Sequence, residues 1–182
     1  MLITRAPRRS VTKPCQEALC GCPPGDRHVV KHAERSPVSI DWTITFDCAD
    51  PAALAAFWRL ALGYVDGSPP AGFATWPEWL AHVGVPPEEW DDGAFIADPD
   101  GVRPDISFLK VPESKTAKNR VHIDVQAGGG RSEPWAVRWP RVTAAVERLA
   151  AAGATVLRED VQDGTPDHVV MADPEGNEFC VL

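Results

Sequence analysis

The chain contains an internal repeat, and this repeat limits the folds open to it more than any other feature. The pattern Ala-Asp-Pro-acid-Gly occurs at residues 97–101 and again at residues 172–176. Each copy follows a strand-like segment and an amphipathic helical segment and precedes a short apolar segment, so the whole order of elements is repeated. Two copies are too few to stack into a solenoid. We therefore expect a pair of related modules that share one sheet.

Four segments have the pattern of β-strands. Apolar and polar residues alternate over residues 40–47 and again over residues 121–126, which predicts the first strand of each module. The apolar segments 106–111 and 178–182 follow the repeated turns, and they predict the last strand of each module.

A helix is predicted after the first strand of each module. Asp50 is a favourable N-cap with Pro51 at the first helical position, and Gly63 ends the apolar repeat that follows. In the second module we expect the helix to open near Pro140 and to end at Gly153.

The irregular connector within the first module is rich in tryptophan. Thr75 and Glu78 form a capping-box pattern, which predicts a short helix that Gly84 ends. Trp76 and Trp79 lie on one face of this helix. Such a stripe usually packs into a core, and the alternative is that it lines a ligand pocket.

The first 36 residues differ in composition from the rest of the chain. They contain four prolines and seven basic residues against three acidic ones, and they show neither helical nor strand periodicity. We expect a disordered extension that lacks the apolar segment of a secretory signal. The predicted domain covers residues 37–182, with a first module over about 38–112 and a second over about 118–182.

The net charge, the length of the apolar segments and the spacing of the cysteines argue against several kinds of partner and site. The 182 residues carry a formal net charge of -8, which argues against a nucleic-acid partner, and no apolar segment is long enough to span a bilayer. We expect a soluble cytoplasmic protein. Cys15, Cys20 and Cys22 match no zinc-site spacing. Cys48 and Cys180 lie in strand-like segments and are expected to be buried free thiols.

Strand alternation places polar residues on the sheet face that the helices leave open. The residues expected on this face are Thr43, Thr45, Asp47, His122, Asp124, Gln126, Glu178 and Cys180. Such a face is simply solvated in many antiparallel sheets. If it lines a cleft, His122 and Glu178 are good ligands for a divalent metal ion. Such an ion polarises a carbonyl or enolate oxygen while a carboxylate moves a proton.

Several short motifs, taken together, resemble a known family. They lie at residues 47–51, 55–58, 62–63, 73–76, 90–93, 98–101, 111–113, 118–124 and 173–179. Over about residues 38–182 the chain is similar to the glyoxalase-like proteins of the vicinal oxygen chelate superfamily. That superfamily includes glyoxalase I, bleomycin-resistance proteins and extradiol dioxygenases.

The resemblance implies an α+β fold, in which two tandem βαβββ modules form a curved mixed sheet with a cleft. It also implies that the metal enzymes of the family take four ligands from the first and last strands of both modules. His122 and Glu178 match the two ligand positions of the second module, whereas Thr43 stands at the position that corresponds to His122. The other position in the first module is Asp105, Ser107 or Leu109, and Asp105 is the good ligand among them.

The sequence leaves three functions open. The first is a lyase or isomerase that acts on a small oxygenated molecule with Zn, Ni, Mn or Fe, and in which Glu178 or Asp124 is the base. Thr43 in place of a histidine weighs against ordinary glyoxalase I chemistry. The second is a metal-free protein that binds or confers resistance to a drug-like molecule, and the third is an interaction or regulatory module. The predicted pocket residues are Thr43, Thr45, Trp76 and Trp79. Each of these proteins can pair with a second copy as a homodimer.

Overall fold

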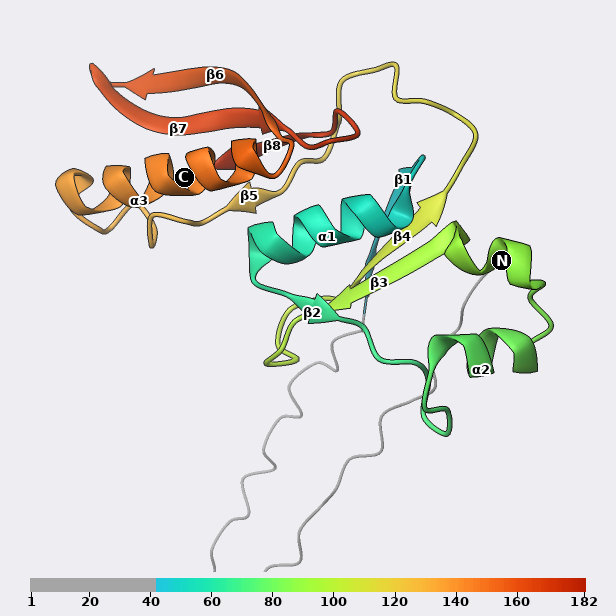
Figure 1. Ribbon diagram of the computed structural model, residues 1–182. Helices are drawn as coiled ribbons and strands as arrows, with labels where there is room; N and C mark the ends of the chain where they lie inside the picture. Colours follow the sequence, from blue (N-terminus) through green and yellow to red (C-terminus); the bar gives the residue numbers. More distant parts are fainter. Residues whose placement is uncertain (1–41) are drawn as a thin grey trace, which may run out of the picture. The chain divides into compact units, whose positions relative to one another are not determined.

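The computed structural model describes residues 42–182. The predicted extension over residues 1–36, with its three cysteines, lies outside this part of the chain. The described residues form two successive βαβββ modules, as the repeat predicts (Figure 1). None of their helices is long and apolar enough to cross a membrane.

The first module contains four strands, two α-helices and a short 3-10 helix. In chain order these are β1 (Ile44–Cys48), α1 (Pro51–Leu62), β2 (Val65–Asp66), α2 (Trp76–His82), η1 (Pro87–Asp92), β3 (Gly93–Ala97) and β4 (Ile106–Lys110). The strands form a mixed sheet in the order β1-β4-β3-β2. β1 runs parallel to β4, and the other two pairs are antiparallel.

The second module repeats this topology without the extra helices. Its elements are β5 (Asp124–Val125), α3 (Trp135–Ala151), β6 (Thr155–Gln162), β7 (Thr165–Ala172) and β8 (Glu178–Val181). The sheet order is β5-β8-β7-β6, with β5 parallel to β8. Among the described strands, hydrogen bonds pair only members of the same module, so the shared sheet expected from the repeat is divided into two four-stranded sheets.

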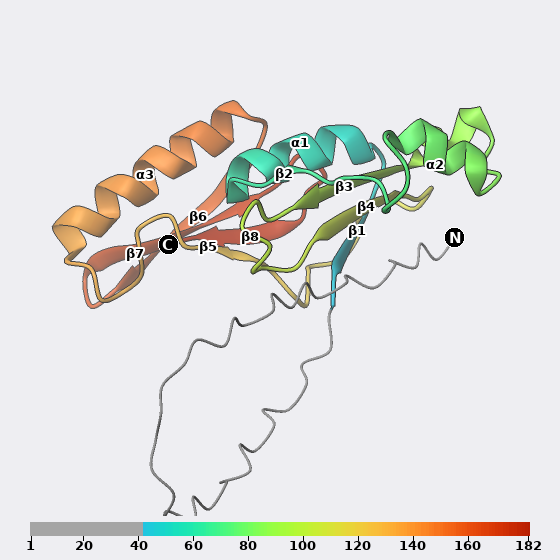
Figure 2. The ribbon, with the colours of Figure 1, turned by 90° about the horizontal axis from the view of Figure 1, so that it is seen from below.

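A common core joins the two modules. Figure 2 shows α1 on one face of the first sheet and α3 on one face of the second. The rings of Phe57 and Trp58 on α1 lie with their centroids 5.8 and 5.3 Å from that of Phe179 on β8. The Trp58 indole also donates a hydrogen bond to the buried Asp173 carboxylate at 3.1 Å. The two modules are therefore held together by side-chain packing and not by a continuous sheet.

Helix α3 begins earlier than the sequence predicts. It starts at Trp135, and Pro140 lies inside it rather than at its opening. The first turn is held against β7, because the buried Arg138 guanidinium bonds to the carboxylate of Asp167 at 3.2 Å and the Trp135 indole donates to the Pro166 carbonyl at 2.8 Å. These contacts offset the hydrogen bond that a proline removes from a helix.

Candidate functional site

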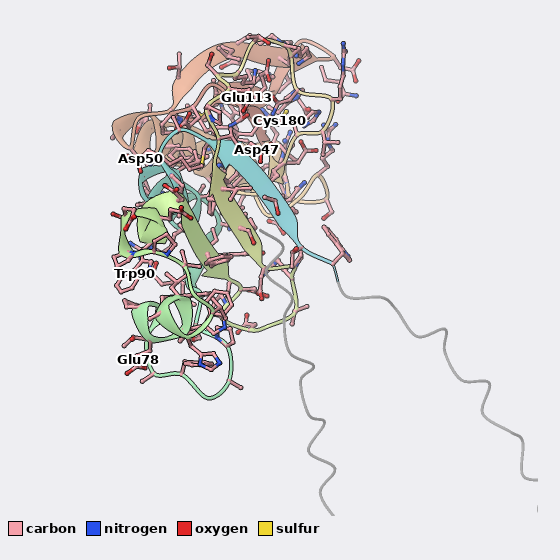
Figure 3. The ribbon with its side chains drawn as sticks, turned by 90° about the vertical axis from the view of Figure 1, so that its right-hand side faces the viewer. Asp47, Asp50, Glu78, Trp90, Glu113 and Cys180 are labelled. Atoms are coloured by element: carbon pink, nitrogen blue, oxygen red, sulfur yellow. The ribbon has the colours of Figure 1, made fainter. Side chains whose placement is uncertain are left out.

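The open face of the second sheet brings four polar residues into register. Asp124 on β5 lies opposite Cys180 on β8 in the parallel ladder. Continued backwards by two residues, the same register sets His122 opposite Glu178. Because side chains alternate along a strand, all four belong to the face that α3 does not cover. Cys180 and, on β1 of the first module, Asp47 are labelled in Figure 3.

Three of these residues form a cluster, which we call the His122–Asp124–Cys180 cluster. His122 Nδ1 lies 3.0 Å from Asp124 Oδ1 and 3.9 Å from Cys180 Sγ. The three donor atoms lie within 4.8 Å of one another, and within residues 42–182 no other trio of histidine, cysteine or acidic residues is so placed. The His122 and Asp124 side chains are 47% and 48% exposed, whereas Cys180 is buried.

The donors of the cluster fit a divalent metal ion. An imidazole nitrogen, a carboxylate oxygen and a thiolate sulfur are the ligand types of zinc and of similar borderline ions. Typical zinc bond lengths space the nitrogen and sulfur of a tetrahedral site by about 3.6 Å. His122 Nδ1 and Cys180 Sγ, at 3.9 Å, lie close to this spacing.

The cysteine of the cluster lies on an apolar patch of the open face. Val170 on β7 and Leu182 form a small buried cluster with Cys180. Burial and the negative charge of Asp124 both raise the pKa of the Cys180 thiol. The sulfur is therefore shielded from water on one side and faces the polar donors on the other.

Glu178 makes its contacts with the segment between the modules instead. Its Oε2 atom accepts a hydrogen bond from the Asn119 amide at 3.0 Å and lies 3.1 Å from Lys115 Nζ. These two contacts lower the pKa of the Glu178 carboxyl to about 2. A carboxylate with so low a pKa is a weak proton acceptor. The structure groups His122 with Asp124 and Cys180, and the expected His122–Glu178 ligand pair stays a prediction.

The open face of the first sheet carries hydroxyl groups where the second carries the cluster. Thr45 lies opposite Ser107, in the same ladder position as Asp124 and Cys180 in the second module. Continued by two residues, this register sets Thr43 opposite Asp105. The three residues left open for the first module, 105, 107 and 109, all belong to this face. Asp105 is the one that corresponds to Glu178 in register.

The predicted tryptophan helix is confirmed as α2, including both hydrogen bonds of its capping box. The Trp76 ring stacks on Phe95, with centroids 4.5 Å apart and planes at 12°, and its indole donates to the Gly67 carbonyl at 2.8 Å. Phe95 pairs with Ser107, so its side chain belongs to the open face of the first sheet. Trp79 is 9% exposed and lies edge-on to Trp76. Trp76 therefore lies beside the open face, and Trp79 packs behind it.

Two residues of the site were not predicted as such. Cys180 is buried and free, as expected, but its approach to His122 was not foreseen. The available signal was its period-two spacing from Glu178 on the same strand. Lys115 lies in the connector between the two predicted modules, and its contact with Glu178 depends on how that connector folds back.

Solved structures with low sequence identity resemble the chain. A hypothetical protein from S. aureus is 15% identical, with a TM-score of 0.49 over 80% of this chain and 94% of that chain. A glyoxalase/bleomycin resistance protein/dioxygenase family enzyme from Burkholderia phytofirmans is 16% identical, with a TM-score of 0.48 over 76% and 94%. The fosfomycin resistance protein FosX from Listeria monocytogenes, in complex with Mn(II) and 1S,2S-dihydroxypropylphosphonic acid, is 14% identical, with a TM-score of 0.49 over 79% and 89%.

A family comparison covers the described part of the chain almost completely. No curated protein sequence matches the chain. The family model for the glyoxalase-like domain matches residues 43–182, which contain both βαβββ modules and the His122–Asp124–Cys180 cluster. The chain therefore belongs to the glyoxalase-like domain family.

Proposed function

We propose that this protein is a metal-assisted lyase or isomerase that acts on a small oxygenated molecule at the open face of its second module. The observation that carries the proposal is the His122–Asp124–Cys180 cluster, in which nitrogen, oxygen and sulfur donors converge on one face. A bound divalent ion supplies Lewis-acid polarisation of a carbonyl or enolate oxygen.

His122 and Asp124 act as a pair in this proposal. Asp124 Oδ1 lies 3.0 Å from His122 Nδ1, so the two side chains present an oxygen and a nitrogen donor next to each other. Asp124 is also the better placed of the two candidate bases. Its side chain is half exposed, whereas Glu178 is ion-paired with Lys115 and has a pKa of about 2.

The test compares two residues at corresponding positions of the modules. The protein is stripped with a chelator, reloaded with Zn, Ni, Mn or Fe(II), and screened by NMR against small carbonyl and enediol compounds. We expect turnover that depends on the added ion. It should fall at least about tenfold in His122→Ala, the lower end of the loss seen for other metal-site changes, whereas Thr43→Ala should keep the bound ion. Turnover that survives the chelator would overturn the proposal.

A second candidate function is metal-free binding of a planar, drug-like molecule. It is favoured by the Trp76–Phe95 stack, which lies beside the hydroxyl-bearing face of the first sheet. Aromatic faces of this kind stack on planar ligands. The test is tryptophan fluorescence of the chelated protein with a panel of aromatic compounds. Binding that is kept in His122→Ala and lost in Trp76→Ala would favour this function over the metal-assisted one.

A further inference from the structure

We infer that Cys180, and not Glu178, joins His122 in holding the metal ion, so that the site takes a thiophilic divalent cation such as Zn(II), Co(II) or Cd(II) in preference to Mn(II) or Mg(II). The inference rests on the proposed function and deepens it by naming the ligand set and the class of ion. Thiolate ligands select for such cations, whereas sites built from oxygen donors favour Mn and Mg.

The first step is the position of the sulfur. Cys180 lies opposite Asp124 in the ladder, and its Sγ atom is 3.9 Å from His122 Nδ1. One sulfur, one nitrogen and one oxygen donor are thus presented from two adjacent parallel strands. In the proposed site, side-chain rotation brings these atoms to bonding distance of a common ion. On binding, the ion replaces the thiol proton, which passes to solvent, and a metal–thiolate bond forms.

The second step is the engagement of Glu178. The Asn119 amide and the Lys115 ammonium both contact the same carboxylate oxygen, Oε2, at 3.0 and 3.1 Å. A metal ion on this oxygen would compete with the ammonium group and release the connector. The contacts of Oε2 therefore anchor residues 115–119, and this is the role that we assign to Glu178.

The third step is the environment of the sulfur. Val170 and Leu182 bury one side of Cys180, so water does not compete for it there. Arg158 is a cation on β6, which β7 separates from β8, and it is paired with Asp160 at 3.0 Å, so its charge is balanced locally. The half-exposed Asp124 leaves negative charge beside the sulfur, which favours a cation at this position.

The experiment is a Co(II) titration followed by absorption spectroscopy. It uses the full chain with Cys15→Ser, Cys20→Ser and Cys22→Ser, so that only the two described thiols remain. We expect a near-ultraviolet thiolate-to-cobalt charge-transfer band in this background. Cys180→Ser should abolish the band and weaken Co(II) binding at least about tenfold. Glu178→Gln and the control Cys48→Ser should keep the band and change the affinity by less than about threefold.

The outcomes separate this inference from the proposed function. If Co(II) binds and is lost in His122→Ala, but gives no band and requires Glu178, the inference is wrong and the metal-assisted function stands. If no ion binds to the natively folded protein, both are wrong. Circular dichroism checks the fold of each variant. X-ray absorption of the zinc-loaded chain needs no variant at Cys180, and it should show a sulfur neighbour at about 2.3 Å; nitrogen and oxygen neighbours alone would overturn the inference.

Discussion

The two modules share a topology but differ in what they display. In each, the first strand runs parallel to the last, and corresponding positions are occupied by Thr45 and Ser107 in one module and by Asp124 and Cys180 in the other. The first pair offers hydroxyl groups, and the second offers a carboxylate and a thiol beside His122. The duplicated fold thus provides equivalent positions, and the side chains at those positions decide which functional groups each module displays.

The repeated turns show the same relation between a shared scaffold and a local addition. Asp98 accepts hydrogen bonds from two backbone amides of its own turn, and so does Asp173. Asp173 alone also accepts the indole N–H of Trp58 from the other module. One turn therefore closes only its own module, whereas the other also joins the two modules.

The largest expected effect is the gain of a complete site in the first module. Thr43→His, Thr45→Asp and Ser107→Cys together copy the cluster into the corresponding ladder positions. If the ligand set rather than the module decides metal binding, the triple variant should hold two zinc ions per chain where the wild type holds one. Elemental analysis after dialysis measures this ratio. The triple alanine variant is the control, and a folded transplant that still holds one ion would contradict the comparison.

The next effect concerns the core that the modules share. Phe179 is 1% exposed and contacts the rings of Phe57 and Trp58. Phe179→Ala should lower the free energy of unfolding by about 3–5 kcal/mol because it leaves a cavity between the modules. Urea unfolding followed by fluorescence and by circular dichroism should show one coincident transition. The exposed Val161→Ala should change stability by less than about 0.5 kcal/mol. Separate transitions for the two probes would mean that the modules are independent.

A smaller difference is expected between the repeated turns. Asp173→Ala leaves the buried Trp58 indole without its acceptor, so it should cost about 2 kcal/mol of stability. Asp98→Ala removes acceptors only from its own turn, and it should cost less. Thermal unfolding of the two variants, side by side, measures the difference. Equal losses would show that the contact between modules adds nothing.

The smallest effect is a pH dependence that belongs to the second module. The pKa of Glu178 is lowered to about 2 by Asn119 and Lys115, so its ionised form stabilises the native state above the ordinary pKa of 4.5. This contribution is lost as the pH falls from 4.5 through about 2. The melting temperature of Glu178→Gln should therefore lie below that of the wild type at pH 6, and the gap should narrow towards pH 2. Glu88→Gln, an exposed acid on η1, controls for the lost charge. A gap that does not change with pH would contradict the assignment.

Local signals in the sequence were enough to predict most of the elements. The Asp50 cap, the Thr75–Glu78 capping box and the repeated turns depend on neighbouring residues, and each forms as expected. Contacts between distant segments were beyond such signals. The start of α3 depends on Arg138 reaching Asp167, and the division into two sheets depends on how the core packs.

The site was predicted only in part, because local signals in the sequence do not determine contacts between distant segments. Strand alternation correctly places His122, Asp124 and Cys180 on one face, because alternation is a local property of the chain. Which of those residues approach one another depends on the fold of the connector. Glu178 contacts Lys115 of the connector, whereas the Cys180 thiol lies 3.9 Å from His122 Nδ1.

In the proposed function only the second module carries the metal site, and the number of ions per chain tests this most directly. The wild type, His122→Ala and Thr43→Ala are dialysed against zinc, and bound metal is measured by elemental analysis in folded samples. We expect one ion per chain in the wild type and in Thr43→Ala, and none in His122→Ala. An ion that persists in His122→Ala, or that disappears equally in both variants, would contradict the account.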